Sequence, residues 1–421
     1  MKRYDAYKDS GVQWIGEIPK HWGTRKIKYL FKERSEKGYP NEPILCATQK
    51  YGVIPQSLYE NRVVVVNKGF EGLKLVKKGD FVISLRSFQG GIEYAYYQGI
   101  ISAAYTILKS IGNMNSLYIK YLFKIHPFIE LLKTCVTGIR EGQNINYDIL
   151  KNKYIILPPL SEQQSIVTYL KERTSKIDQY VTEREREREL FESLKQSEIA
   201  NVVTKGLNPN APMKDSGIPW IGMIPEHWEV KKIRTCFQER REKVSDKDYP
   251  PLSVSKMGII PQLDTAVKTD NGDNRKKVCQ GDFVVNSRSD RKGSCGLSSY
   301  EGSVSLINIV LLPREVNGMY YHYLFRSNNY IEEFYRQGRG IVADLWTTRY
   351  SEMKNINIPV PPLSEQQAIV DYIDNKLQKI DQYITDLQSE IDYLKEFKQR
   401  LISDVVTGQI CVAEPQKGEQ Q

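Results

Sequence analysis

The sequence lacks the features typical of membrane-spanning, secreted and metal-binding proteins. Its longest aliphatic runs, Val63–Val66 and Ile309–Leu312, are far too short to cross a bilayer. Residues 1–10 are polar and contain no apolar stretch typical of a signal peptide. The 6 cysteines include no C-x-x-C pair, which argues against both a zinc site and a disulfide framework. We therefore expect a cytoplasmic protein that binds neither a membrane nor a metal.

Motifs of common catalytic sites are also missing. The sequence contains no G-x-x-x-x-G-K-[ST] loop for ATP and no H-E-x-x-H motif. Its prolyl pairs at 158–159 and 361–362 follow Leu and Val, so neither forms the motif of amino-methyltransferases. His21 and His227 each precede a tryptophan, and we interpret them as packing residues. We expect no catalytic residue and no bound cofactor in this chain.

Size and charge indicate a folded protein with more than one structural unit. The chain has 421 residues, of which 40% are hydrophobic and 26% charged. At about 150 residues per domain, this length predicts two or three units. The 60 Lys and Arg exceed the 51 Asp and Glu, giving a net charge of +9. This excess favours an anionic partner, although many cytosolic proteins have a similar balance.

The chain contains a long internal repeat. Residues 8–22 recur as residues 214–228, with 11 of 15 positions identical. The motif Pro-Pro-Leu-Ser-Glu-Gln-Gln at 158–164 returns at 361–367, and Val-Val-Thr at 202–204 returns at 405–407. Between these shared ends the match is limited to short landmarks such as Gly-Asp-Phe-Val. A period of about 200 residues is too long for a solenoid and predicts a duplicated unit whose interior has diverged.

A long helix is predicted to begin at each Pro-Pro-Leu-Ser-Glu-Gln-Gln motif. The prolines would end the preceding strand, and S-x-x-Q is a capping box with serine at the N-cap and glutamine at N3. The glutamate would place negative charge at the positive end of the helix dipole. These interface positions are Ser161, Glu162 and Gln164 in the first copy and Ser364, Glu365 and Gln367 in the second.

Apolar residues follow each motif with helical spacing. In the second copy they alternate steps of three and four, a heptad stripe that includes Ile380, Ile384, Leu387 and Ile391 and is broken only by Lys398. The stripe of the first copy is weaker, because it passes through the charged run Glu183–Glu189. We expect the two helices to pack on each other as an antiparallel pair, since each stripe needs a partner.

These observations predict an α+β fold class. Two duplicated mixed α/β domains are joined by two long helices that form an intramolecular antiparallel coiled coil with pseudo-twofold symmetry. The predicted segments are a first domain at 1–158, a central helix at 159–206, a linker at 207–217, a second domain at 218–361, a distal helix at 362–412 and a disordered tail at 413–421.

This layout resembles the specificity subunit of type I restriction-modification systems. In that family, two target recognition domains are joined by two similar helical regions that form an antiparallel coiled coil. The resemblance covers residues 9–412 and is carried by Trp-Ile-Gly-x-Ile-Pro-x-His-Trp, Pro-Pro-Leu-Ser-Glu-Gln-Gln and Val-Val-Thr, each present twice and in order. The run Glu183–Glu189 departs from it, and we interpret that run as a solvated helix face with i,i+3 Glu–Arg pairs.

The resemblance implies a function without catalysis in this chain. It implies recognition of an asymmetric two-part target in double-stranded DNA, with methylation and cleavage carried out by partners. The implied partners are a methyltransferase subunit, usually in two copies, and an ATP-driven restriction and translocase subunit. S-adenosylmethionine, ATP and Mg²⁺ are accordingly expected on those partners and not on this chain.

Base-reading residues are expected where the two halves differ. Our first choice is the loop after each Gly-Asp-Phe-Val strand, because arginine pairs with guanine, glutamine pairs with adenine, and basic side chains also hold phosphates. An aligned pair of arginines is equally well explained as a scaffold salt bridge. The candidates are Arg86, Ser87, Gln89, Arg288, Arg291 and Lys292 in these loops, Gln49, Lys50, Ser255 and Lys256 before Gly-Val/Ile-Ile-Pro, and Gln143 and Asn144.

Two other functions are compatible with the same architecture. A duplicated coiled-coil protein could be a stand-alone DNA-binding repressor or a structural scaffold. Stable co-purification with a methyltransferase subunit would favour the specificity subunit, whereas a chain that binds operator DNA alone would favour the repressor.

Overall fold

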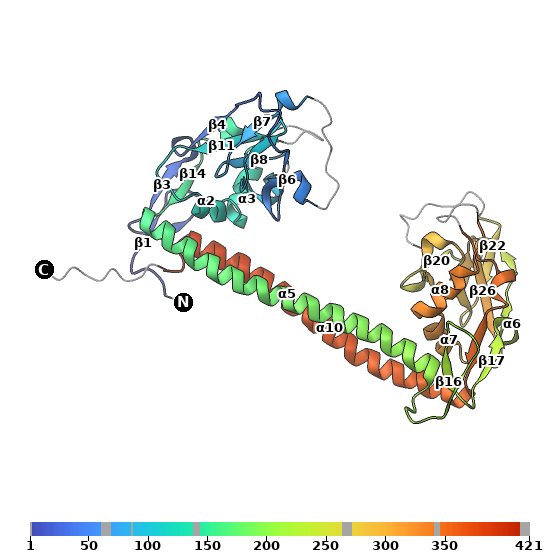
Figure 1. Ribbon diagram of the computed structural model, residues 1–421. Helices are drawn as coiled ribbons and strands as arrows, with labels where there is room; N and C mark the ends of the chain where they lie inside the picture. The colour runs from blue at the N-terminus through green and yellow to red at the C-terminus, as the bar shows by residue number, and fades with distance from the viewer. Residues whose placement is uncertain are drawn as a thin grey trace. The chain divides into compact units, whose positions relative to one another are not determined.

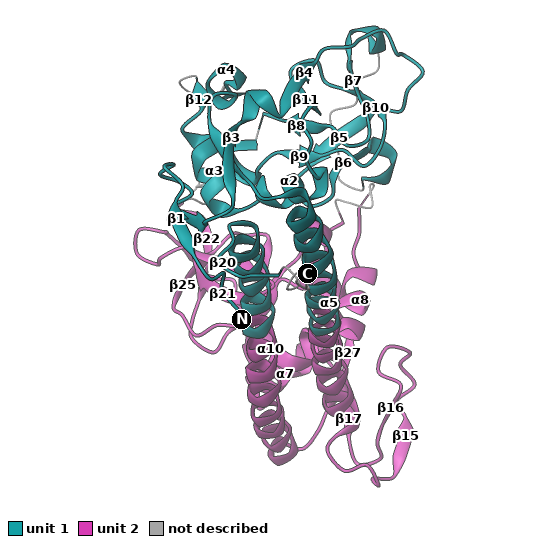
Figure 2. Cartoon of the chain, turned by 90° about the vertical axis from the view of Figure 1, so that its left-hand side faces the viewer, with its two compact units in different colours: residues 1–184, 389–421 teal, residues 185–388 magenta. Residues whose placement is uncertain are grey.

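The structure is a computed structural model that describes residues 2–59, 69–85, 87–137, 144–262, 272–340 and 346–412 (Figure 1). The chain divides into two compact units (Figure 2). Unit 1 comprises residues 1–184 and 389–421, and unit 2 comprises residues 185–388. Each unit therefore contains one globular part and segments of both long helices. The tail predicted to be disordered, 413–421, lies outside the described residues.

Unit 1 is built around a four-stranded antiparallel sheet. Its order is β4 (Phe31–Arg34), β11 (Thr106–Ser110), β8 (Phe81–Ile83) and β9 (Glu93–Tyr94). Paired strands surround it: β1 (Tyr7–Asp9) with β2 (Glu17–Pro19), β3 (Gly23–Lys26) with β14 (Tyr154–Leu157), β5 (Leu45–Thr48) with β6 (Gly52–Pro55), β7 (Lys74–Val76) with β10 (Gly99–Ile101), and β12 (Val136–Thr137) with β13 (Asn144–Ile145). The short helices are α1 (Ser87–Gly90), α2 (Ser116–Leu122), α3 (His126–Lys133) and α4 (Tyr147–Leu150), with 3₁₀ turns at Ile27–Tyr29, Gln56–Leu58 and Phe70–Gly72.

Unit 2 repeats this arrangement. Its four-stranded sheet has the order β18 (Phe237–Glu239), β26 (Asn308–Pro313), β23 (Phe283–Asn286) and β24 (Cys295–Leu297). Around it lie β15 (Met213–Asp215) with β16 (Met223–Pro225), β17 (Glu229–Lys232) with β27 (Asn357–Val360), β20 (Leu252–Ser255) with β21 (Gly258–Pro261), and β19 (Lys243–Val244), β22 (Arg275–Val278) and β25 (Gly302–Val304) in one sheet. The short helices are α6 (Ile233–Cys236), α7 (Gly318–Phe325), α8 (Asn328–Arg336) and α9 (Tyr350–Met353), with a 3₁₀ turn at Ser289–Arg291. The duplicated α+β architecture predicted from the sequence is confirmed.

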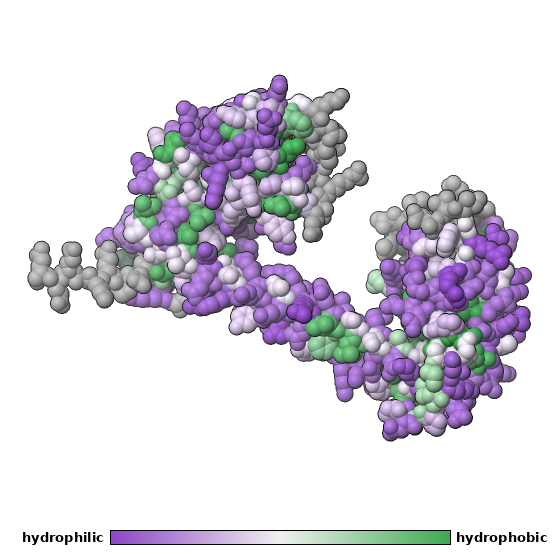
Figure 3. Space-filling view, viewed as in Figure 1, coloured by the Kyte–Doolittle hydropathy of each residue, from purple (hydrophilic) through white to green (hydrophobic). Residues whose placement is uncertain are grey.

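The central strands are buried on both faces. In β8, Phe81 and Ile83 face the main core of unit 1, whereas Val82 faces a smaller cluster that includes Val53 and Ile107. Successive side chains of a strand point to opposite faces, so a strand covered on both sides is apolar without alternation. The continuous apolar sequence of Phe81–Ile83 follows from this burial. Elsewhere the surface seen in Figure 3 is mostly hydrophilic, with small separate apolar patches.

The two long helices are α5 (Leu160–Lys205) and α10 (Leu363–Val406). In unit 1, Asp178 of α5 pairs with Lys398 of α10 at 2.6 Å. In unit 2, Lys195 of α5 pairs with Asp381 of α10 at 2.5 Å. Residue numbers rise along one helix as they fall along the other, so the pairing is antiparallel in both units, as predicted. Of the predicted stripe, Ile380, Leu387 and Ile391 are buried and Ile384 is partly buried, which places them within the helix pair.

The predicted capping box is wrong. Each helix begins one residue before the serine, at Leu160 and Leu363, because the N–H of Gln163 donates to the carbonyl of Pro159 at 3.0 Å and Gln366 repeats this bond with Pro362. Ser161 and Ser364 therefore lie inside the first turn rather than at its N-cap. The predicted N3 residues point elsewhere, since the amide oxygens of Gln164 and Gln367 accept from the side chains of Asn115 and Asn317, each at 2.8 Å.

The interpretation of Glu183–Glu189 as a solvated face is wrong for part of the run. Arg184 lies 3.6 Å from Glu390 of α10, and its side chain is only 33% exposed. Arg188 donates to Gln388 of α10, and Tyr383 of α10 donates to Glu187 at 2.8 Å. Arginine has a long apolar stem and a broad polar end, so it can fill a stripe position while its guanidinium pairs across the helix pair.

The Val-Val-Thr segments end each helix against a globular part. The hydroxyl of Tyr118 donates to the carbonyl of Val406 at 2.9 Å, and Tyr320 donates to Val203 at 2.7 Å. A glycine with positive φ follows each segment, and a side chain at Gly408 would approach the ring of Trp22 to 3.0 Å. Each long helix ends against a copy of the repeated opening segment, which explains why both helices end with Val-Val-Thr.

Candidate nucleic-acid interface

The loops predicted to read bases follow equivalent strands of the two sheets. In unit 1 the loop leaves β8 and contains α1; Arg86 lies outside the described residues. Ser87 is 2% exposed, and its hydroxyl accepts from the N–H of Ser84 at 2.8 Å. Ser87 therefore shapes the loop from within, whereas Gln89 is exposed and available for contact.

The equivalent loop of unit 2 presents three basic side chains. Arg288 pairs with Asp290 at 3.0 Å within the loop, and its side chain remains 45% exposed. Arg291 is 67% exposed, and Lys292 pairs with Glu332 of α8 at 2.9 Å. The pairing of Arg288 is thus local to the loop rather than a bridge within the sheet scaffold. An exposed guanidinium paired with a loop carboxylate can exchange that partner for a base or a phosphate.

The hairpin turns predicted as the second reading segment lie next to other parts of the candidate interface. Gln49 and Lys50 form the turn between β5 and β6, and Ser255 and Lys256 lie at the turn between β20 and β21. The hydroxyl of Ser255 accepts from the N–H of Met257 and donates to the carbonyl of Gly258, both at 3.1 Å, so it shapes its turn. The side chain of Gln49 lies over Gly90, where an added Cβ would come within 2.6 Å of it.

The third predicted pair is only half described. Gln143 lies outside the described residues, and Asn144 is exposed at the start of β13. The structure therefore brings together Gln49 and the α1 loop in unit 1. The strand β13, which begins at Asn144, also lies beside α1.

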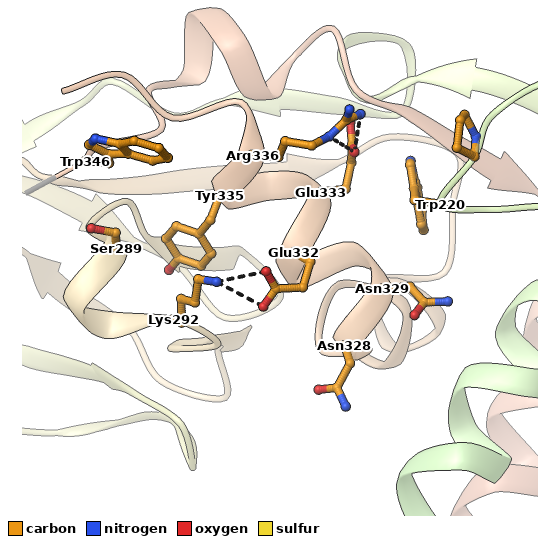
Figure 4. Close-up of a pocket in the computed structure, with 11 residues that line it drawn as sticks. Trp220, Ser289, Lys292, Asn328, Asn329, Glu332, Glu333, Tyr335, Arg336 and Trp346 are labelled. Carbon is orange, nitrogen blue, oxygen red and sulfur yellow. Dashed lines mark hydrogen bonds and ion pairs between the residues drawn. The ribbon is translucent and has the colours of Figure 1, made fainter. Parts of the chain in front are cut away.

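Several residues near the loop of unit 2 were not predicted from the sequence. A pocket of about 750 Å³ lies beside the loop, and Figure 4 shows α8 running along it. Aromatic side chains from three separate segments line it, namely Trp220, Tyr335 and Trp346. The backbone of Ser289 is held by Trp346 through an N–H···O bond of 2.9 Å. The aromatic residues of α8 and Trp346 carry no sequence signal, because this part of the repeat has diverged and only the fold brings it to the loop.

Two basic residues at the ends of equivalent helices were also missed. Lys124 follows α2 and donates to the carbonyl of Gly90 at 2.8 Å and to Glu93 at 2.5 Å. Burial raises the pKa of Glu93 to about 6, although Lys124 opposes the shift. Arg326 follows α7 and donates to the carbonyls of Cys295 and Lys256. The matching sequences Tyr-Leu-Phe-Lys at 121–124 and Tyr-Leu-Phe-Arg at 323–326 were the available signal.

The predicted glutamates hold the long helices to the globular parts. Glu162 accepts from Trp22 at 3.0 Å, from Tyr4 at 2.8 Å and contacts His21 at 2.5 Å. Glu365 repeats two of these contacts, accepting from Trp228 at 2.8 Å and contacting His227 at 2.5 Å. The two histidines are about half exposed and hydrogen-bond to these glutamates, so they anchor the helix starts without being packed into a core.

Neither a membrane helix nor a metal-binding cluster is found among the described residues. None of the described helices is both long and apolar enough to cross a bilayer. Within the same residues, no group of three or more His, Cys, Asp or Glu side chains is placed to hold a metal ion.

Comparisons with known proteins agree with this geometry. The family model of the type I restriction modification DNA specificity domain matches residues 19–185 and 225–393, once in each half. The type I restriction enzyme MjaVIII specificity subunit of Methanocaldococcus jannaschii is 23% identical, over 96% of this chain and 93% of that protein. The EcoKI specificity subunit of Escherichia coli K12 is 24% identical over 45% of this chain and 44% of its own length.

Solved structures show the same fold. One chain, from a study of complex assembly and conformational transition in the type I R-M system, matches with a TM-score of 0.67, covering 93% of this chain and 99% of its own at 15% identity. The HsdS subunit of Thermoanaerobacter tengcongensis matches with a TM-score of 0.50 over 93% of this chain and 98% of its own, also at 15% identity. Together with the two matched specificity domains, these findings show that the chain belongs to the specificity subunits of type I restriction-modification systems.

Proposed function

We propose that each unit reads one half of a two-part target in double-stranded DNA through the loop that follows β8 or β23. The observation that carries this proposal is that equivalent loops on equivalent strands present different exposed side chains. Among the described residues, unit 1 presents Gln89, whereas unit 2 presents Arg291 and Lys292. Arg288 has an arginine, Arg86, at the aligned position in the sequence. Two copies of one frame with different reading loops suit a target whose two halves differ in sequence.

The exposed side chains have the chemistry required for base and phosphate contacts. Arginine can donate two bonds to guanine, and glutamine can exchange two with adenine, each pairing discriminating by about 1–3 kcal/mol. Arg288 keeps nearly half of its side chain exposed despite its bond to Asp290, so it is our candidate for a base contact. Lys292 is the candidate for a phosphate, because a single ammonium group is a point charge that fixes position without reading sequence.

Catalysis is assigned to partner subunits. The related proteins are specificity subunits of type I restriction enzymes, and one structural match comes from a study of how the type I complex assembles. We infer that this chain directs a methyltransferase subunit, in two copies, and a restriction and translocase subunit to its target. S-adenosylmethionine would be bound by the first partner, and ATP with Mg²⁺ by the second, while this chain supplies no catalytic group.

Methylation mapping tests the proposed function. The full chain is co-expressed with the methyltransferase subunit encoded with it, the complex is purified, and methylated adenines are mapped on random-sequence DNA. We expect co-purification and one consensus with two specified parts separated by an unspecified spacer. The chain alone should transfer no methyl group from labelled S-adenosylmethionine.

Other outcomes would favour a different function. A chain that does not co-purify with the methyltransferase but binds one duplex sequence alone would be a repressor. A chain that binds neither would be a scaffold, and both results would overturn the specificity role of this chain.

A further inference from the structure

A partly buried lysine holds the candidate reading loop of unit 1. The ammonium of Lys124 donates to the carbonyl of Gly90, at the end of α1, and to the carboxylate of Glu93 in β9. The neighbouring Gly91 has a φ of +83°, and an added Cβ would lie 2.2 Å from the carbonyl oxygen of Phe123. The loop is therefore pressed against the end of α2 and tied there by Lys124.

The basic residue at the same place in unit 2 holds a different segment. Arg326 donates through Nη1 to the carbonyl of Cys295 in β24 at 3.0 Å and through Nη2 to the carbonyl of Lys256 at 2.5 Å. Lys256 belongs to the turn between β20 and β21, and the next residue, Met257, is 85% exposed. Arg326 thus fixes an exposed hairpin turn and also the first residue of β24, where the loop after β23 ends.

Other elements hold the remainder of the loop after β23. The hydroxyl of Tyr335 in α8 donates to the carbonyl of Asn286 at 3.0 Å, and the N–H of Thr348 donates to the carbonyl of Ser287 at 3.0 Å. A Cβ at Gly293 would lie 3.3 Å from the side chain of Ile331 in α8. The basic residues at equivalent helix ends therefore hold different backbone carbonyls, Gly90 in unit 1 and both Cys295 and Lys256 in unit 2.

Partial burial makes the contacts of Lys124 suitable for positioning. The side chain of Lys124 is only 25% exposed, and that of Glu93 only 3% exposed. A partly desolvated ammonium with two acceptors is held more firmly than a surface lysine, because water competes less for its bonds. Lys124 is therefore less free than the exposed Arg291 of the unit 2 loop, and Arg326, which is partly buried, is restrained by its two carbonyl acceptors.

We propose that Lys124 and Arg326 are positioning residues, each setting recognition of the half-target read by its own unit. Lys124 does so by holding the Gly90 carbonyl, and Arg326 by holding the Lys256 carbonyl. The inference rests on the proposed function and adds that the basic residue at the same helix end holds different backbone carbonyls in each half, including that of the hairpin turn only in unit 2. Neither residue needs to touch DNA.

The test uses the full chain in complex with its methyltransferase subunit. The double variant Lys124→Met with Glu93→Gln removes the bond to Gly90 without leaving a buried carboxylate unpaired. We expect about a tenfold loss of discrimination between bases in one half of the methylated consensus, with the other half unchanged. Arg326→Met should affect only the opposite half. The conservative variant Lys124→Arg should keep most of the discrimination that the double variant loses.

Two matched variants separate positioning from general destabilisation. Lys74 and Lys276 are also largely buried lysines, and they donate to the carbonyls of Tyr105 and Asn308, each at 2.8 Å. Neither carbonyl belongs to a candidate reading segment. Lys74→Met and Lys276→Met should lower the melting temperature while leaving both halves of the consensus unchanged.

The possible failures are distinguishable. If the wild-type complex yields no two-part consensus, the proposed function is overturned before any variant is compared. If the wild type yields one and the Lys124 and Arg326 variants keep it, the positioning role is overturned. It is also overturned if Lys74→Met changes the same half-target as the Lys124 double variant.

Discussion

In each unit, the glutamate of the repeated motif anchors the first turn of a long helix, but the number of its hydrogen-bond partners differs. Glu162 of unit 1 has three aromatic or imidazole partners, and its side chain is 14% exposed. Glu365 of unit 2 has two such partners and is 39% exposed. The additional partner is Tyr4, from the N-terminal segment. The comparison shows that the repeat preserves the anchor itself, while segments outside the repeat adjust its strength.

The two units also bury different ionisable groups at equivalent places. Glu93 lies opposite Val82 in β8, and the residue opposite Val284 in the matching strand is Gly296. In unit 2 the buried group is His322 of α7, whose Nδ1 accepts from the N–H of Leu297 at 3.1 Å. Burial and the nearby Arg326 lower the pKa of His322 to about 4. The diverged interiors of the two units therefore differ in which group has a shifted pKa, as well as in their loops.

The largest effect should come from removing the anchor. Glu162→Ala leaves the indole N–H of Trp22 and the hydroxyl of Tyr4 without their acceptor, so we expect a loss of about 4 kcal/mol in the free energy of unfolding. Glu365→Ala should lose about 2 kcal/mol, because its site has fewer donors and more solvent. Urea denaturation measures both, with the exposed Glu226→Ala as a control that should change little. Equal losses would show that Tyr4 adds nothing.

The next effect should appear as a pH dependence in unit 2. Because the pKa of folded His322 is lowered from 6.5 to about 4, its stabilising contribution is present above pH 6.5 and is lost as the pH falls through 4. The difference amounts to about 3 kcal/mol. Stability against urea, measured from pH 7 to pH 4 for the wild type and for His322→Gln, should show the wild type losing more. Parallel curves would contradict the buried neutral state of His322.

A smaller and opposite dependence should appear in unit 1. Because the pKa of folded Glu93 is raised from 4.5 to about 6, its contribution is fully present below pH 4.5 and is lost as the pH rises through 6. The expected change is about 2 kcal/mol. Glu93→Gln should remove this slope while keeping the bond between Lys124 and Gly90. If stability depends more steeply on pH in the variant than in the wild type, the pH dependence comes from Lys124 and not from Glu93.

The smallest effect should be Arg288→Ala, which changes one reading contact. We expect a loss of about 1–2 kcal/mol at a single base position in the half-target of unit 2, because Arg288 must first exchange Asp290 for a base. Competition binding of the assembled complex to duplexes with single substitutions measures the loss. Arg291→Ala, at the more exposed neighbour, provides the comparison. Uniform weakening across all sequences would instead assign Arg288 to a phosphate.

Sequence patterns predicted the frame well and the local contacts poorly. The heptad stripe predicted the helix pair because apolar spacing depends only on helical periodicity. The capping box failed because Pro159 accepts the first helical bond one residue early, leaving Ser161 inside the turn. The charged run was misread because the position of Glu390 across the helix pair is not evident from the residues around Arg184.

The sequence by itself determined the duplication, the antiparallel helix pair and the family, because these rest on repeated motifs and on periodicity, which are local. Only the tertiary structure decided that Lys124 holds Gly90 while Arg326 holds Lys256. It also decided that the carbonyl of Trp346 holds the backbone of Ser289 in the loop after β23. These partners lie tens of residues apart and come from the diverged interior. Their pairing depends on how strands and helices pack, and no repeated motif records it.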